Sequence, residues 1–113
     1  MNLDQEFGAV SAQDAVLEGT IELKGKPGTM TGGIGYHELS LKNPYMGFSD
    51  FRASFTPETP ASWSVEPREG ALQKTPTLFQ IKFRPEGIGT FEGYLVIETE
   101  DFKKTWKVIG STN

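Results

Sequence analysis

The sequence contains no cysteine and only one histidine, His37. Without cysteine the chain can form neither a disulfide nor a thiolate nucleophile, which fits a reducing compartment. Carboxylates are then the main ligands left for a metal, and no spacing of Asp and Glu resembles a calcium-binding loop. A histidine base also needs a nucleophile and an orienting carboxylate, and the neighbours of His37 do not supply both. We therefore predict that the chain is not an enzyme and expect no catalytic residue, no metal site and no cofactor.

Long apolar segments and clustered charge are also absent. No run approaches the roughly 18 apolar residues of a membrane span, and residues 1–6 lack the basic start and apolar stretch of a signal peptide. The net charge is -4, from 11 Lys and Arg against 15 Asp and Glu, with both signs spread along the chain. This pattern gives no basic surface for nucleic acid or an anionic membrane. We expect a soluble domain, intracellular or inside an organelle, whose partners include neither nucleic acid nor a membrane that it enters.

The length of 113 residues suits one domain with a single core. Residues 1–14 mix acidic, small and polar types without a period, which predicts a flexible N-terminal arm, and residues 15–113 then form the domain. From Leu17 onward apolar and polar residues alternate, with Leu17, Ile21 and Leu23 facing inward, as in strands with one buried face. The alternation predicts about seven strands, at residues 17–24, 36–42, 51–55, 63–66, 79–84, 94–98 and 104–109.

Turn-forming residues separate the predicted strands. Prolines follow several of them, because proline lacks the amide hydrogen that a sheet needs, and residues 25–35 hold five glycines and a proline. The glycine-rich segment predicts a mobile connection. Short strands at this spacing, with no amphipathic helix, are typical of an antiparallel β-sandwich. We predict an all-β, immunoglobulin-like sandwich with Trp63 and Trp106 in its core.

An ordered series of motifs extends over the second half of the chain. It comprises Trp63-Ser-Val65-Glu-Pro67-Arg-Glu-Gly70, Phe79-Gln-Ile81-Lys-Phe83-Arg-Pro85, Gly89-Thr-Phe91-Glu-Gly93-Tyr-Leu95 and Val108-Ile-Gly110, after an upstream Leu39-Ser-Leu41-Lys-Asn43-Pro44. The series resembles the immunoglobulin-like domains of the major sperm protein (MSP) group and the related ASH-type domains of ciliary and centrosomal proteins, including hydin. The resemblance implies a docking or scaffolding module without chemistry of its own.

One part of that group departs from this chain. Its membrane-tethering members bind short peptides through basic residues on one sheet face. The corresponding segment here, residues 55–63, contains no Lys or Arg and carries Glu58. We therefore transfer no binding residue from those members.

The strongest candidate for a binding surface is the connection that follows Asn43. Tyr45, Met46, Phe48 and Phe51 bring four large apolar side chains into a segment that also contains proline and glycine. Tyrosine, phenylalanine and methionine are enriched at binding surfaces. Two interpretations stay open. Either Phe48 and Phe51 close one end of the sandwich, or Tyr45, Met46 and Phe48 form an exposed patch that binds a partner protein.

The sequence is compatible with two functions. The leading prediction is a non-enzymatic protein-interaction or scaffolding module that docks to a partner or a larger assembly through a sheet edge or an end loop. The alternative is a sandwich that binds a small ligand or carbohydrate in a groove lined by aromatic residues such as Tyr36, Tyr45 or Phe91. The acidic run from Glu98 to Asp101 is interpreted as the polar turn between the last two strands. The glycine-rich segment lacks the Gly-Lys-Ser/Thr of a phosphate-binding loop and is interpreted as a plain connection or a flap.

Overall fold

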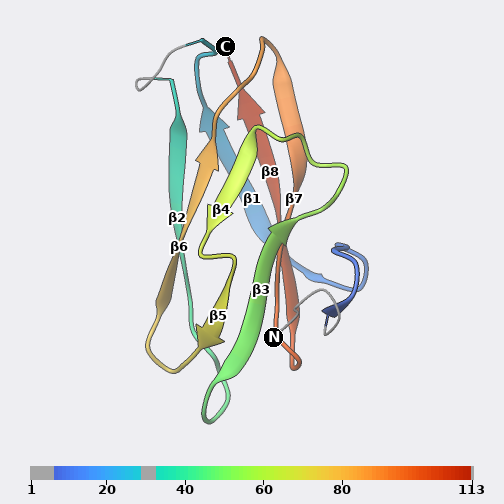
Figure 1. Ribbon diagram of the computed structural model, residues 1–113, viewed down its shortest axis with the longest axis vertical. Helices are drawn as coiled ribbons and strands as arrows, with labels where there is room; N and C mark the ends of the chain where they lie inside the picture. The colour runs from blue at the N-terminus through green and yellow to red at the C-terminus, as the bar shows by residue number, and fades with distance from the viewer. Residues whose placement is uncertain (1–6, 29–32, 113) are drawn as a thin grey trace.

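The computed structural model describes residues 7–28 and 33–112. These residues form two β-sheets packed face to face (Figure 1). The eight strands of the described residues are β1 (Val16–Lys24), β2 (Gly35–Leu41), β3 (Ser49–Phe55), β4 (Trp63–Glu66), β5 (Glu69–Leu72), β6 (Thr77–Phe83), β7 (Thr90–Glu98) and β8 (Lys103–Ser111). The predicted all-β, immunoglobulin-like sandwich is confirmed. No helix among the described residues is long and apolar enough to span a membrane.

The two sheets differ in size. The larger has five strands in the order β1-β8-β7-β3-β5, and the smaller has three in the order β2-β6-β4. All pairs are antiparallel except β1 with β8, which run parallel. The central strand β7 is buried along its second half, as its nearly continuous apolar sequence predicts. The edge strands are β1 and β5 in the larger sheet, and β2 and β4 in the smaller.

The core fills the space between the inner faces of the sheets. Phe51 of the larger sheet meets Phe79 of the smaller edge to face, with ring centroids 5.1 Å apart. Trp63 packs against Phe83 at 4.9 Å, and the Trp106 ring is buried among the same residues, so the predicted core positions of both tryptophans are confirmed. Aromatic rings bury a large apolar area and favour such tilted contacts. These rings hold the two sheets together.

Two glycines inside strands permit close approaches that a side chain would prevent. A Cβ atom at Gly110 of β8 would lie 2.5 Å from the ring of Phe83, and one at Gly93 of β7 would lie 2.4 Å from the hydroxyl oxygen of Thr59. Gly93 therefore lets the β3–β4 connection rest on β7, where the Thr59 hydroxyl accepts a hydrogen bond from the Tyr94 amide. This packing explains the last glycine of the Gly-x-Phe-x-Gly motif, Gly93, and of the Val-Ile-Gly motif, Gly110.

Two strand predictions were wrong in detail. Strand β5 was not predicted, because it has only four residues and Leu72 is the one that is fully buried. Strand β7 begins at Thr90 rather than at the predicted Tyr94. Both errors concern stretches that are short or contain glycine. In such stretches too few residues alternate between apolar and polar for a strand to be recognised.

The inward position predicted for Leu17 was also wrong. Leu17 pairs with Thr105, whereas Gly19 pairs with Trp106, so Glu18 is an extra residue in β1. A bulge of this kind moves the residues before it to the opposite face of the sheet. Leu17 consequently lies on the side away from Trp106 and is 60% exposed, while Ile21 after the bulge is buried as predicted.

Two predictions of flexibility fall partly outside the described residues, namely residues 1–6 of the arm and 29–32 of the glycine-rich segment. The described end of the arm contacts the sheet through Arg52 and Lys103. The glycine-rich segment is bridged at its base by a hydrogen bond from the Lys26 amide to the Gly33 carbonyl. The division into residues 1–14 and 15–113 stays a prediction.

Candidate docking site

The β2–β3 connection is fixed by the buried side chain of Asn43. Its amide oxygen accepts a hydrogen bond from the backbone N–H of Tyr45, and its amide nitrogen donates to the carbonyl of Gly47, at 3.3 and 3.4 Å. The Asn43 backbone N–H donates to the carbonyl of Gln73 in the β5–β6 connection, at 2.6 Å. Gly47 has a positive φ of 82°, which glycine adopts without strain. The backbone of the loop is therefore held from inside.

The side chains of this loop point the other way. Tyr45 is 52%, Met46 85% and Phe48 72% exposed, whereas Phe51 lies in the core at 1%. Of the two interpretations, Phe51 alone fits the closing of the sandwich, and Tyr45, Met46 and Phe48 form an exposed apolar patch. We call these three residues the end patch. That it binds a partner stays a prediction.

The β2–β3 connection, which carries the end patch, lies at the lower end of the sandwich together with the β5–β6 and β7–β8 connections (Figure 1). The β5–β6 connection is joined to the patch loop through Gln73. The β7–β8 turn is joined to the start of β3, where the Ser49 hydroxyl donates to the Asp101 carboxylate at 3.3 Å. Leu78 near the start of β6 adds another exposed apolar side chain, opposite Ser40 of β2. The end patch thus sits on a braced surface rather than on a free loop.

The acidic run is only in part the turn that the sequence predicts. Glu100 and Asp101 lie in the β7–β8 turn, where the Thr99 hydroxyl accepts the amide hydrogens of Asp101 and Phe102. Glu98 is the last residue of β7 and is buried, and its carboxylate pairs with Arg52 of β3 at 3.2 Å, which offsets the cost of burying the charge. The turn interpretation was therefore wrong for Glu98, which ends β7 as it ends the predicted strand 94–98.

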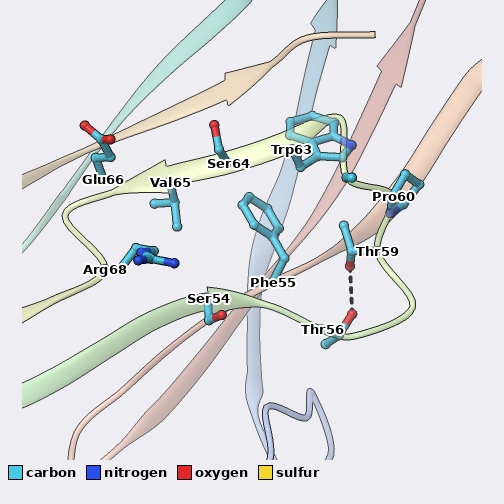
Figure 2. Close-up of a pocket in the computed structure, with 11 residues that line it drawn as sticks. Ser54, Phe55, Thr56, Thr59, Pro60, Trp63, Ser64, Val65, Glu66 and Arg68 are labelled. Carbon is cyan, nitrogen blue, oxygen red and sulfur yellow. Dashed lines mark hydrogen bonds between the residues drawn. The ribbon is translucent and has the colours of Figure 1, made fainter. Parts of the chain in front are cut away.

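An open cleft lies between the end of β3 and the edge strand β4 (Figure 2). It has a volume of about 470 Å³, with apolar residues Phe55, Trp63 and Val65 beside the hydroxyl pair of Thr56 and Thr59. The segment 55–63 brings no basic residue here, as its sequence shows. The guanidinium of Arg68, which follows β4, enters the lining instead.

The residues expected for a ligand groove lie apart. Tyr36 is exposed near the start of β2, and Tyr45 lies beyond the other end of that strand. The ring of Phe91 packs on Phe83 at the core, 5.8 Å between centroids. His37 is exposed on the edge strand β2. Within residues 7–28 and 33–112, no three His, Cys, Asp or Glu side chains lie close enough together to hold a metal ion.

Two structural roles were missed by sequence reasoning. Asn43 follows the predicted strand 36–42, and Asn before Pro is a known signal for a turn in which the Asn side chain hydrogen-bonds the backbone two residues on. The alternation in the predicted strand 51–55 places Arg52 on the outer face, and nothing in the local sequence indicates its pairing with Glu98, 46 positions away. A signal therefore existed for the first residue and not for the second.

The chain resembles known proteins in its three-dimensional structure, while comparisons of its sequence find no match. No family model and no curated protein matches the chain. Among solved structures, the ASH/PapD-like domain 7 of human CEP192 superposes with a TM-score of 0.67 at 14% identity, over 83% of this chain and 80% of that one. SSP-19 of Caenorhabditis elegans, described as an MSP-domain protein like family member, gives 0.55 at 8% identity, over 82% and 94%. The C. elegans MSP family member WR4 gives 0.50 at 12%, over 80% and 92%. The chain therefore has the immunoglobulin-like fold that MSP and ASH/PapD-like domains share.

Proposed function

We propose that this chain is a non-catalytic protein-docking module and that the end patch is the surface that holds its partner. The observation on which the proposal rests is the display of Tyr45, Met46 and Phe48 in water on a loop whose backbone is fixed by Asn43. Apolar surface in water costs about 25 cal/mol per Å². A loop that only connects two strands has no need of three such side chains.

The fixed backbone also favours binding. Association costs free energy for every loop and side chain that becomes ordered, so a surface that is already held loses less on binding. Aromatic and methionine side chains are the types from which contact surfaces are built, and methionine adapts its shape to a partner. The fold supports the same proposal, because the MSP and ASH domains that the chain resembles act as docking or scaffolding modules.

The double variant Tyr45→Ala/Met46→Ala tests the proposal. Each truncation is expected to weaken partner binding by about 1–3 kcal/mol, which corresponds to roughly 5- to 150-fold in the dissociation constant. The measurement has two steps. Proteins that co-purify with the wild-type chain from a native extract are identified, and the affinity of the purified partner is then measured for both proteins.

Ile88→Ala provides the matched control, because Ile88 is 86% exposed in the β6–β7 connection. It should leave the affinity unchanged. Both variants should keep the melting temperature within about 2 °C, as expected for surface substitutions. Unchanged partner affinity in the double variant contradicts the proposal. A thermal shift produced by a panel of sugars or nucleotides, with no protein partner, favours the ligand-binding alternative.

A further inference from the structure

Several residues on the outer face of the five-stranded sheet are buried although they point away from the core. Leu95 and Ile97 of β7 belong to the core, so Val96 between them faces outward, yet only 1% of its surface is exposed. Its neighbours across the sheet include Thr105 of β8, which is also buried, and Arg52 and Glu98 lie one step further along. Something other than the second sheet covers this face.

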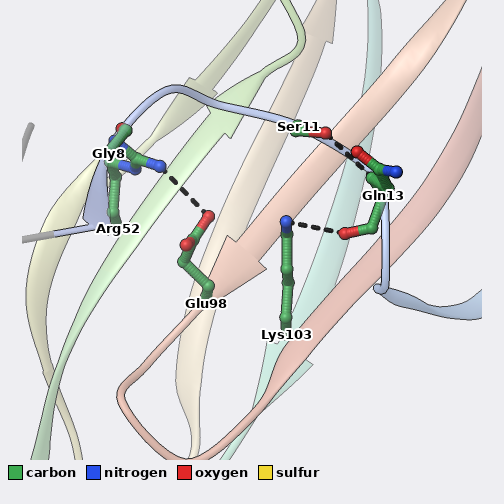
Figure 3. A network of polar contacts seen from close by, with 6 residues as sticks. All are labelled: Gly8, Ser11, Gln13, Arg52, Glu98 and Lys103. Atoms are coloured by element: carbon green, nitrogen blue, oxygen red, sulfur yellow. Dashed lines mark hydrogen bonds and ion pairs between the residues drawn. The ribbon is translucent and has the colours of Figure 1, made fainter.

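The described part of the N-terminal arm, residues 7–14, lies across this face (Figure 3). At one end Arg52 donates a hydrogen bond to the Gly8 carbonyl, and the Phe7 ring lies 5.5 Å from the guanidinium carbon. At the other end the Lys103 ammonium donates to the Gln13 carbonyl at 2.8 Å. Arg52 belongs to β3 and Lys103 to β8, with β7 between them. The residues between the two attachments therefore cross over β7.

The first attachment includes a buried ion pair. The Arg52 and Glu98 side chains are only 6% and 10% exposed, and they meet at 3.2 Å. The Arg52 guanidinium thus serves a carboxylate of the sheet and a carbonyl of the arm at once. Charges in such a site need partners on all sides, since water is excluded. The arm supplies one of the hydrogen-bond partners of Arg52.

The hydrogen bonds that Arg52 and Lys103 donate to residues 7–14 go to the backbone of the arm. Gly8 and Gln13 are bound through their carbonyl oxygens, and Phe7 supplies an aromatic contact. None of the residues 7–14 belongs to the core between the sheets. The core between the sheets therefore does not include the described part of the arm.

We propose that residues 7–14 are a strap that closes the outer face of the five-stranded sheet, with Arg52 and Lys103 as its attachment points and Phe7 as its anchor. The face accepts an extended segment that brings one aromatic ring and two backbone carbonyls, and the chain's own arm is its occupant. While the strap is bound, no other segment reaches Val96 or Thr105. Its release opens a second surface, on β3, β7 and β8 rather than on the end patch.

Thiol labelling tests the proposal cleanly, because the chain has no cysteine of its own. Val96→Cys places a probe under the strap, and Val108→Cys places a matched probe in the core, at a valine that is also fully buried. In the full chain both should react slowly with an aromatic disulfide reagent such as DTNB. Adding Phe7→Ala, which removes the ring over Arg52, should raise the labelling rate at position 96 roughly tenfold. The rate at position 108 should not change.

Lys103→Ala provides an independent release of the other attachment and should raise the rate at position 96 as well. Three results overturn the proposal. Fast labelling of Val96→Cys in the otherwise native chain shows that the face is not closed. Equal acceleration at positions 96 and 108 shows that the whole sandwich opens instead of the strap. No acceleration by either Phe7→Ala or Lys103→Ala shows that these contacts do not hold the arm.

Discussion

Replacement of Arg52 by methionine is expected to lower the free energy of unfolding by about 3–5 kcal/mol. Methionine keeps much of the length of the side chain but leaves the buried carboxylate of Glu98 without its cation. An uncompensated charge in a site closed to water is among the most destabilising changes a single substitution can make. The measurement is chemical denaturation followed by tryptophan fluorescence, with the slope m compared between proteins.

The double variant Arg52→Met/Glu98→Met separates charge from packing. An ion pair replaced by apolar side chains of similar size is often neutral, so the double variant should recover most of the stability lost by Arg52→Met. Glu18→Gln serves as the surface control, because its partner Lys104 and Glu18 itself are about one-third exposed, and it should cost less than about 1 kcal/mol. A loss below 1 kcal/mol for Arg52→Met, or no recovery in the double variant, contradicts the interpretation.

Truncation of Phe79 to alanine should remove a comparable amount of stability, about 3–5 kcal/mol. Phe79 is fully buried in β6 and meets Phe51 of the opposite sheet, so its loss leaves a cavity where the two sheets join. Folded domains are stable by only about 5–15 kcal/mol. The variant should therefore unfold at a much lower denaturant concentration, measured as for Arg52→Met.

Leu78→Ala is the matched control for Phe79→Ala. Leu78 is the neighbour of Phe79 in the same strand, but its side chain points away from the core and is 62% exposed. The two truncations should differ by at least about 2 kcal/mol, because only one of them opens a cavity. Similar losses at the two positions show that β6 does not present Phe79 to the core in the register described.

The strands could be read from the sequence because their signal is local. A strand with one buried face alternates apolar and polar residues, and β4 and β6 follow that rule. The sandwich could be predicted from the number of such strands and the turns between them. The order of the strands and the parallel pairing of β1 with β8 could not, because they depend on contacts far apart in sequence.

The same limit explains the errors at single residues. Leu17 fits an alternating pattern, and only the register against β8 shows that Glu18 is inserted between it and the buried positions. The N-terminal arm has no period, and its place on the sheet depends on Arg52 and Lys103, which lie 44 and 90 positions from their partners Gly8 and Gln13. Such contacts leave no trace in the sequence of the arm itself.

The amino-acid composition of residues 45–51 pointed to the candidate site, but it did not show which of their side chains are exposed. An unusual set of apolar residues marked residues 45–51 as a binding segment or as the closure of the sandwich. The sequence gives no means of telling that Phe48 is exposed while Phe51, three residues later, is in the core. The distinction arises because β3 begins at Ser49, after the turn that Asn43 organises.

Oxidative footprinting of the complex with the co-purified partner tests the docking proposal most directly. Methionine and aromatic side chains react readily with hydroxyl radicals when exposed, so Met46, Tyr45 and Phe48 should be oxidised rapidly in the free protein. We predict that the bound partner slows oxidation of these three residues several-fold and leaves Tyr36, on the outer face of the smaller sheet, unchanged. Full reactivity of Met46 in the complex, with protection elsewhere on the domain, contradicts the end patch as the docking surface.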